Sequence, residues 1–144
     1  MRAQYPSSFK PMGQPAAKKG DQVFALDTHI VMVPAPLPPP VPTPLPHPFT
    51  GIINGELSSD VNIMGMPAAT VNSTADNTSP HLPTPPGVSF QKPPSNKATI
   101  KFGSATVKIN GKAAARNGDK AETCNDPSDL PAGTVVAVGT VMIG

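Results

Sequence analysis

The residues best suited to chemistry in this sequence are its three histidines and its single cysteine. Imidazole nitrogen and thiolate sulfur are ligands that Zn²⁺ prefers, and four of them complete one closed tetrahedral site. The set consists of His29, His47, His81 and Cys124, with successive separations of 18, 34 and 43 residues. These separations match no local zinc-finger pattern. Spacing alone therefore leaves open a default interpretation of scattered surface imidazoles and one buried thiol.

Two further features favour a shared metal site. Only 38% of the 144 residues are apolar and 4% are aromatic, so the hydrophobic driving force is weak, and small scaffolds in that position often depend on a metal. A single cysteine also excludes a disulfide within the chain. In addition, His81 and Cys124 each follow one copy of a repeated segment at a similar distance. Equivalent loops of repeated hairpins tend to meet at one end of a fold.

A catalytic use of these residues is disfavoured. A hydrolytic zinc needs an open position for water, whereas four protein ligands would close the site. The sequence contains no Gly-x-Ser-x-Gly, phosphate loop or His-Glu-x-x-His motif. As a nucleophile Cys124 would need a base, but it stands beside the turn Asn125-Asp126-Pro127. We therefore expect no enzyme; a small zinc hydrolase using Asp27 or Glu56 is the remaining catalytic alternative.

The strongest internal pattern is a repeat. Residues 61–70 (VNIMGMPAAT) align with residues 107–116 (VKINGKAAAR), sharing Val, Ile, Gly and two alanines in register. Each copy predicts a short strand, a tight turn containing Gly, and small residues after it. Asn110-Gly111 is the preferred pair for a type I′ hairpin turn. The composition includes 21 Pro and 12 Gly, which disfavour helices, so we expect short strands and hairpins with little or no helix.

Further strands are expected at residues 27–33, 98–102 and 134–144, the last interrupted by a bulge or bend at Gly139. Alternation in the first places His29, Val31 and Val33 on one face. We expect residues 1–20 to form a flexible arm and residues 21–144 to form a single domain.

Residues 34–48 contain nine prolines and predict an extended segment that is largely polyproline II. Such segments are usually linkers or ligands for aromatic grooves. A cytoplasmic proline-rich adaptor that binds a groove-bearing partner is therefore the alternative function. Against it, His47 lies inside the segment and apolar residues follow.

Charge and hydropathy exclude other classes of function. The formal charge is +2, which is too balanced to predict nucleic-acid or membrane-surface binding. No signal peptide and no apolar run of spanning length is present, so we expect synthesis in the cytoplasm and no stable membrane anchoring.

Several segments together resemble the proline-alanine-alanine-arginine (PAAR) repeat family. They are Met66-Pro67-Ala68-Ala69-Thr70, Lys112-Ala113-Ala114-Ala115-Arg116 with Gly118-Asp119 and Cys124, and the runs THIVMVP, PLPHPFTG and TSPHLP. The wider pattern covers about residues 27–144 and is similar to the PAAR-like branch of contractile injection systems. Thr70 stands where the motif has Arg, and Ala113 where it has Pro. A third full copy is not visible unless residues 28–50 are its degenerate remnant.

The resemblance implies a mostly β, small conical PAAR-like fold with proline-rich loops and three pseudo-repeats. By position it implies one structural Zn²⁺ near the apex, held by His29, His47, His81 and Cys124. It also implies a structural tip that caps and sharpens the trimeric β-helical spike of a contractile injection system, either a type VI secretion system or an extracellular one. Such a tip would help to pierce the target envelope, be assembled in the bacterial cytoplasm and be expelled with the apparatus. Effector cargo is a further partner that the family allows.

Overall fold

The computed structural model describes residues 13–144, in which thirteen strands and no helix are present. The absence of helix within this range agrees with the prediction from proline and glycine content, and it leaves no helix there that could span a membrane. The strands are β1 Gln14–Pro15, β2 Gln22–Val33, β3 Val41–Gly55, β4 Asn62–Ile63, β5 Met66–Pro67, β6 Thr74–Asn77, β7 Ser89–Phe90, β8 Lys97–Ile100, β9 Lys108–Ile109, β10 Lys112–Ala113, β11 Lys120–Thr123, β12 Leu130–Val136 and β13 Met142–Ile143.

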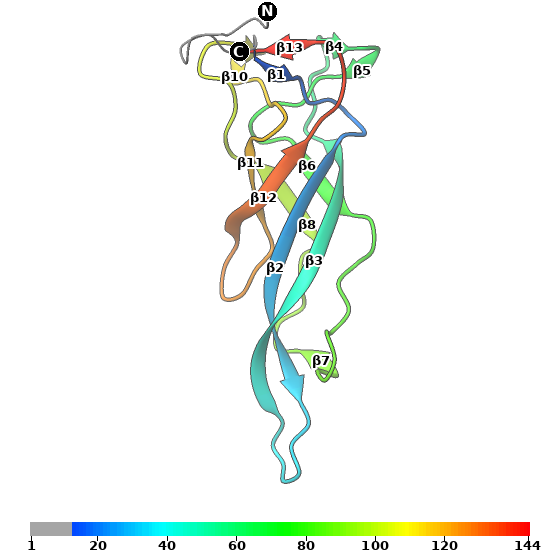
Figure 1. Cartoon of the computed structure of the whole chain (residues 1–144), viewed down its shortest axis with the longest axis vertical. Coiled ribbons are helices and arrows are strands. Elements are labelled where there is room, and N and C mark those ends of the chain that lie inside the picture. The colour runs from blue at the N-terminus through cyan, green and yellow to red at the C-terminus, as the bar shows by residue number, and fades with distance from the viewer. Residues whose placement is uncertain (1–12) are drawn as a thin grey trace, which may run out of the picture.

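Six of the strands form a closed antiparallel barrel. Their order is β12-β11-β8-β6-β3-β2, and β12 pairs back with β2. Closure removes the free sheet edges that would otherwise invite aggregation. One end of the molecule, where the chain termini of the described residues lie, is broad, and the opposite end narrows to the β2–β3 hairpin (Figure 1). The expected conical, mostly β fold is therefore confirmed.

Three short hairpins build the broad end. Two of them, β4–β5 and β9–β10, are the repeat copies identified in the sequence. Asn110 and Gly111 both have positive φ, 52° and 78°, as a type I′ turn requires. The third hairpin is formed by β1 and β13, from the two ends of the chain, with Gln14 opposite Ile143.

This third hairpin corrects two expectations. The short hairpin of the missing copy does not lie within residues 28–50, which belong to the long β2–β3 hairpin; it is formed by residues 141–144 together with residues from 13 onward. The arm was also expected to extend to residue 20, but Ala16 and Ala17 are buried in the core. The domain therefore includes residues 13–20, and residues 1–12 of the predicted arm lie outside the described residues. Sequence comparison missed the copy because its two halves are at opposite ends of the chain.

Backbone hydrogen bonds link the three copies in a ring. The Ala17 N–H donates to the Ala115 carbonyl at 2.9 Å, Ala115 donates to Ala69 at 3.1 Å, and Ala69 donates to Ala17 at 3.0 Å. All three side chains are fully buried, and nothing larger than a methyl group projects where the backbones approach. The ring gives the broad end a pseudo-threefold arrangement, with the three copies consisting of residues 13–55 with 141–144 (copy 1), 61–100 (copy 2) and 107–136 (copy 3).

The core repeats with the same symmetry. A layer near the broad end contains one isoleucine and one alanine from each copy: Ile63, Ile109, Ile143, Ala16, Ala68 and Ala114. A second layer inside the barrel includes Phe49, Ile53, Ile100 and Val135. Turn capping is equivalent too, because the backbone N–H groups of Lys18, Thr70 and Arg116 each donate to a side chain three residues later. The ion pair between Arg116 and Asp119, at 2.9 Å, lies in the third of these turns.

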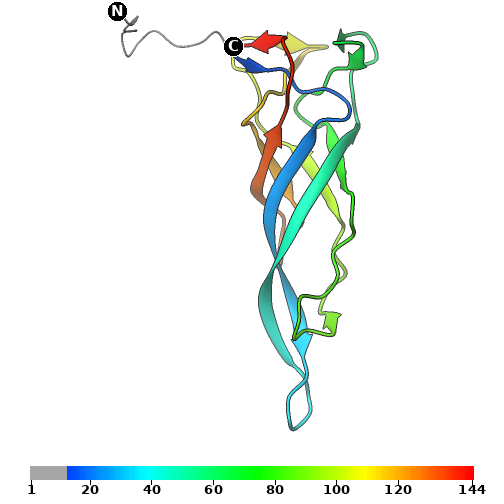
Figure 2. The ribbon, with the colours of Figure 1, turned by 45° about the vertical axis from the view of Figure 1, so that its right-hand side comes forward.

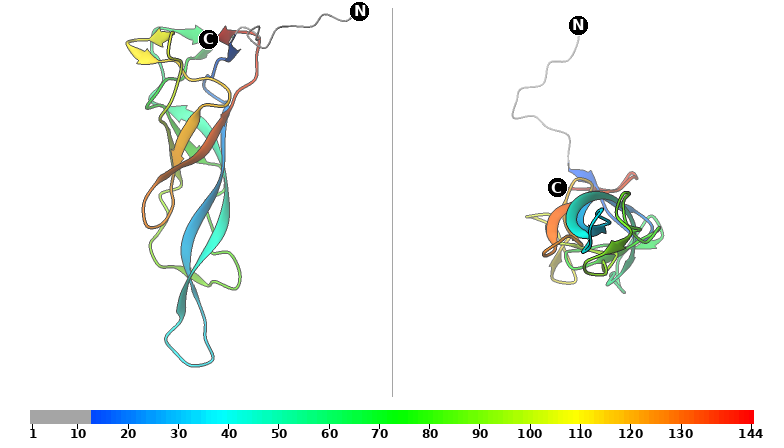
Figure 3. Two further views of the ribbon diagram at one scale, coloured as in Figure 1. Left: turned by 60° about the vertical axis from the view of Figure 1, so that its left-hand side comes forward. Right: turned by 90° about the horizontal axis from the view of Figure 1, so that it is seen from below.

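The narrow end is the continuation of a single hairpin. Strands β2 and β3 pair from Gln22↔Ile52 to Val33↔Val41, well beyond the other barrel strands (Figure 2). Viewed along the long axis, this hairpin lies over the centre of the molecule (Figure 3). Residues 41–48 were expected to be largely polyproline II, but they form part of β3 and pair with β2 along their whole length. This pairing contradicts the interpretation of residues 41–48 as an unpaired linker.

Candidate metal centre

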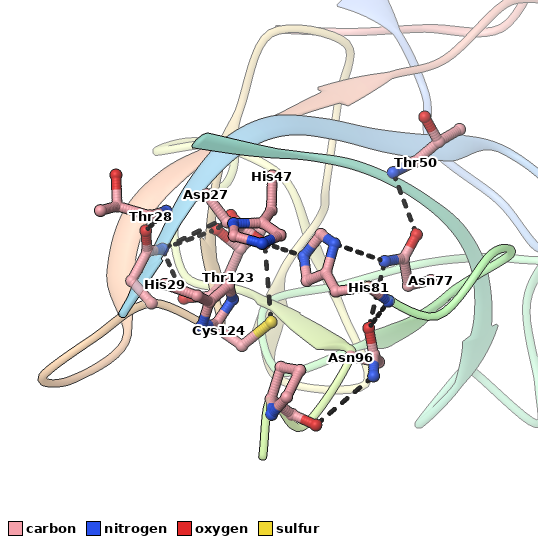
Figure 4. Close-up of polar contacts among 12 residues, drawn as sticks. Asp27, Thr28, His29, His47, Thr50, Asn77, His81, Asn96, Thr123 and Cys124 are labelled. Carbon is pink, nitrogen blue, oxygen red and sulfur yellow. Dashed lines mark hydrogen bonds and ion pairs between the residues drawn. The ribbon is translucent and has the colours of Figure 1, made fainter. Parts of the chain in front are cut away.

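The four predicted ligands lie together where the β2–β3 hairpin leaves the barrel (Figure 4). His29 is on β2, His47 is on β3, His81 is in the loop after β6, and Cys124 directly follows β11. All four side chains are buried, with exposed fractions of 8% or less. Each copy of the repeat contributes at least one of them. The positions of the four side chains therefore agree with the expectation that equivalent loops of different copies meet at one end.

Strand alternation explains how the two hairpin histidines point inward. On β2 the odd-numbered residues face the interior, as predicted for His29 and Val31, which are both buried. On β3 the same is true of His47 and Phe49, while Pro46 and Pro48 face solvent. Because Asp27 is opposite His47 in the register, the two strands direct their polar side chains to the same level.

The loop that holds His81 is fixed by asparagine side chains. The His81 N–H donates to the Asn96 Oδ1 at 2.8 Å, and the Asn77 Nδ2 donates to the same oxygen at 3.2 Å. Asn77 Nδ2 also lies 3.5 Å from His81 Nδ1. The three imidazole rings are consequently close, with centroids 5.4 Å apart for His29 and His47, 5.1 Å for His29 and His81, and 5.5 Å for His47 and His81.

Asp27 is a member of the cluster that the sequence prediction did not include. Ligand atoms of Asp27, His29, His81 and Cys124 all lie within 4.8 Å of one another, so this buried group could bind a metal ion. Asp27 is completely buried. Alternation could have identified it, since Asp27 lies two residues before His29 and therefore shares its inward face.

The ring nitrogens of His29 show that the cluster fits a metal. Both Nδ1 and Nε2 are buried and have no hydrogen-bond partner among the described residues. The nearest carboxylate oxygen, Asp126 Oδ2, lies 3.5 Å from Nδ1 and instead accepts the backbone N–H of Ile30 at 2.8 Å. Buried polar atoms normally have hydrogen-bond partners. An imidazole whose two nitrogens are buried and have no partner is therefore what we expect of a metal ligand in a structure without its ion.

The environment of Asp27 gives the same indication. Its carboxylate accepts from His81 Nε2 at 2.9 Å, Thr123 Oγ1 at 2.5 Å, Cys124 Sγ at 3.5 Å and Asn125 Nδ2 at 3.4 Å. Of these donors only the imidazole can carry a positive charge. A buried carboxylate is costly without a compensating cation, and a divalent ion among these residues would supply one.

His47 is neutral and oriented by the backbone. The Leu45 carbonyl, 2.9 Å from Nδ1, can only accept, so Nδ1 carries the hydrogen. Nε2 then has a lone pair, which accepts the Thr84 N–H at 3.2 Å. An imidazole that donates Nδ1–H to a carbonyl is the usual arrangement of a metal-binding histidine. Nε2 of His47 therefore has the required protonation, but in this arrangement it binds Thr84.

Burial also shifts the pKa values of two histidines and of the cysteine in the cluster. It lowers the pKa of His29 and of His47, which keeps both imidazoles neutral and able to donate a lone pair. Burial, reinforced by the negative charge of Asp27, raises the pKa of the Cys124 thiol. The thiol therefore stays protonated until an ion displaces the hydrogen, because thiolate is the form that binds metal.

A small pocket reaches the cluster from the surface. Its volume is about 80 Å³, and its walls include His29, Cys124, Asp126 and Lys92. The larger pocket of the described residues, about 300 Å³, lies elsewhere, against Glu56, Ser58 and Asn110. Because His29 and Cys124 line the smaller pocket, these two side chains of the cluster can be reached from the surface.

Comparison with known proteins identifies the family. The PAAR motif model matches residues 43–127, which include His47, His81 and Cys124. No curated protein matches the chain. The matched segment contains β3 from residue 43 onward, the whole of copy 2, and copy 3 as far as residue 127, before β12. Because this segment is more than half of the 144 residues, the chain belongs to the PAAR motif family, and membership supports a spike-tip role in contractile injection systems.

Proposed function

We propose that this protein is a non-enzymatic tip that caps a trimeric β-helical spike with its broad end. The observation that supports this most directly is the ring of hydrogen bonds among Ala17, Ala69 and Ala115. It arranges three similar hairpins about one axis within a single chain. A monomer with such an arrangement can offer each subunit of a trimer a similar contact, so one tip suffices for one spike.

The hairpins at the broad end carry exposed apolar side chains suited to this contact. Met64, Met66, Val141 and Met142 are between 37% and 54% exposed. Copy 3 differs, because it presents Lys108 and Lys112 at the positions of Asn62 and Met66 in copy 2. Short exposed strands there can also pair with the free strand edges at the blunt end of a β-helix.

We further propose that the cluster holds one structural Zn²⁺ through His29, His47, His81 and Cys124. Three imidazoles and one thiolate satisfy the tetrahedral preference of zinc, and they leave no open position for a substrate water. For this, Nε2 of His47 would exchange its contact with the Thr84 N–H for the ion. Asp27 would then neutralise the remaining positive charge without being a fourth or fifth ligand. The metal would tie β2 and β3 to copies 2 and 3 at the level where the barrel ends.

Such a cross-link supports mechanical use of the narrow end in piercing a target envelope. At that end two paired strands alone cannot enclose a core, and a metal would take its place. The ligands come from all three copies, so force applied to the hairpin would be distributed to the whole barrel.

The docking proposal is tested by co-purification with the trimeric spike protein encoded for the same machine. The wild-type chain is expected to elute with the spike at one tip per trimer. Met66→Asp combined with Met142→Asp should abolish this without lowering the thermal midpoint, because both side chains are exposed. Leu37→Ser, at the opposite end, is the matched control and should bind normally. Wild-type protein that never associates with its spike would refute the proposal.

A further inference from the structure

The hairpin beyond the metal cluster carries no charged side chain. Residues 30–46 form 17 consecutive positions without a charged side chain, in the sequence IVMVPAPLPPPVPTPLP. Leu37 at the turn is 82% exposed and Val41 is 51% exposed. We call residues 30–46 the tip segment. Elsewhere the chain carries 20 charged residues, so a stretch of this length without any gives the narrow end an apolar surface.

The side chains of the tip segment have almost no hydrogen-bonding groups. Thr43 is its one residue with a polar side chain, and its hydroxyl donates to the Val41 carbonyl at 3.1 Å. No side chain of the segment therefore needs water to complete its hydrogen bonds.

Proline removes the backbone donors along one edge. On β3 the backbone N–H and carbonyl groups of the even-numbered residues point away from β2. Thr50 shows this, because its N–H donates to Asn77 Oδ1 and its carbonyl accepts the Thr78 N–H. In the tip segment and at its boundary these even positions are Pro42, Pro44, Pro46 and Pro48. Proline has no N–H. The free edge of β3 is thus without donors, whereas the odd residues use theirs to pair with β2.

The other edge is covered by protein. On β2, the Ile30 N–H donates to Asp126 Oδ2 at 2.8 Å, and the Ile30 carbonyl accepts the Gln91 N–H at 2.9 Å. The Met32 carbonyl accepts the Val88 N–H at 3.0 Å, where β7 pairs with β2. In the turn, Ala35 and Leu37 are the only residues between 34 and 40 that have an N–H at all. Unpaired backbone N–H groups are costly in hydrocarbon, and this hairpin has fewer of them than an ordinary strand pair.

From these observations we propose that the tip segment inserts into the hydrocarbon layer of a lipid bilayer. The proposal rests on the proposed spike-tip function, which it deepens by assigning the first contact with the envelope to lipid and by naming the residues that make it. From Val33, where β2 ends, to Leu37 the free part of the hairpin can extend at most about 13 Å, at a rise of about 3.3 Å per residue. One leaflet of a hydrocarbon core of about 30 Å has a similar depth. Because the segment is uncharged, insertion should not require anionic lipid.

The experiment uses a tryptophan reporter, since the chain contains no Trp. Leu37→Trp places the sole indole at the turn, and Phe102→Trp, at a side chain 58% exposed near the broad end, is the matched control. Full-length protein is mixed with excess phosphatidylcholine vesicles, with and without bromine on the acyl chains. The Leu37→Trp emission should shift to the blue and lose most of its intensity with brominated lipid, whereas the Phe102→Trp emission should not change.

Three outcomes would overturn the inference. Leu37→Trp emission that stays as in buffer at saturating lipid excludes insertion. Quenching that appears only when phosphatidylglycerol is added, and equally for Phe102→Trp, indicates electrostatic adsorption. A blue shift without bromine quenching would place the indole in an apolar protein environment, such as a contact between two copies of the chain, and not among acyl chains. Co-purification of Leu37→Trp with the spike is measured in parallel. A protein that binds its spike but not lipid refutes this inference alone. A protein that binds lipid but not its spike refutes the docking proposal alone.

Discussion

The carboxylate of Asp27 and the imidazole of His81 meet at 2.9 Å inside the protein, and this contact joins two copies of the repeat. Asp27 belongs to β2 of copy 1, and His81 follows β6 of copy 2. Both side chains are almost completely buried. Whatever the cluster binds, this pair sets its charge, because Asp27 is the one acid among the four residues whose ligand atoms lie close together.

Replacing Asp27 with Asn tests its proposed role beside the metal. The amide keeps the shape but cannot provide two accepting oxygens to His81 and Thr123, so zinc affinity should fall by about 10- to 100-fold while binding is retained. Competition with a chelating indicator measures this affinity. Asp76→Asn is the matched control, since Asp76 is half-exposed and bonds Lys97 and Asn54 at the surface. Complete loss of metal would instead make Asp27 a ligand.

His47→Gln separates His47 from Asp27 as the fourth ligand. If His47 binds zinc, this variant should lose near-stoichiometric metal and should melt at a lower temperature than Asp27→Asn. Gln can still donate to Leu45 and accept from Thr84, which preserves local hydrogen bonding. Cobalt substitution gives the readout, because a tetrahedral site with one thiolate has a characteristic visible spectrum. An unchanged spectrum in His47→Gln would assign the fourth position to Asp27.

Chelation and Cys124→Ser should weaken the protein in the same way. Structural zinc contributes directly to folding free energy, so the thermal midpoint should fall for both, and chelator should have no further effect on Cys124→Ser. Differential scanning calorimetry with and without chelator measures this. A wild-type midpoint that does not respond to chelator would contradict the structural role of the metal.

Most of the fold could be predicted from local patterns, and the parts that could not depend on distant pairing. The hairpin at Asn110-Gly111 follows from turn chemistry, and the inward face of His29 follows from alternation. The third hairpin could not be found this way, because no local window contains both Gln14 and Ile143. Proline composition likewise indicated an extended segment at residues 41–48, but not its partner, since register with β2 is set by the long hairpin.

At the candidate site, too, some residues could be predicted from the sequence and others could not. Ligand chemistry selected the three histidines and the cysteine, and family resemblance grouped them. Asp27 was missed because an aspartate in a strand is unremarkable until its surroundings are known to be buried. The contact of His47 with Thr84 also has no signal in the sequence, because it joins β3 to the loop between β6 and β7, 37 residues further along the chain.

The alanine ring predicts strong sensitivity to side-chain volume. Ala69→Leu places three additional carbons where three backbones meet, and overpacking of this kind costs about 1–3 kcal/mol. Ala105→Leu is the control, since Ala105 is exposed and should tolerate the change. Urea denaturation followed by circular dichroism gives both values. Equal stability of the two variants would contradict the close approach of Ala17, Ala69 and Ala115.

Two glycines in equivalent turns should respond very differently to alanine. Gly13 and Gly111 have nearly the same φ, 73° and 78°, so each substitution pays about 1–2 kcal/mol for the left-handed conformation. At Gly111 a methyl group would extend into open space, whereas at Gly13 it would overlap the carbonyl of Ile143. Gly13→Ala should therefore destabilise the protein clearly more than Gly111→Ala in the same urea titration. It should also weaken spike binding, because β1 and β13 would have to separate. If the two variants unfold at the same urea concentration, the split third hairpin does not contribute to the stability of the broad end.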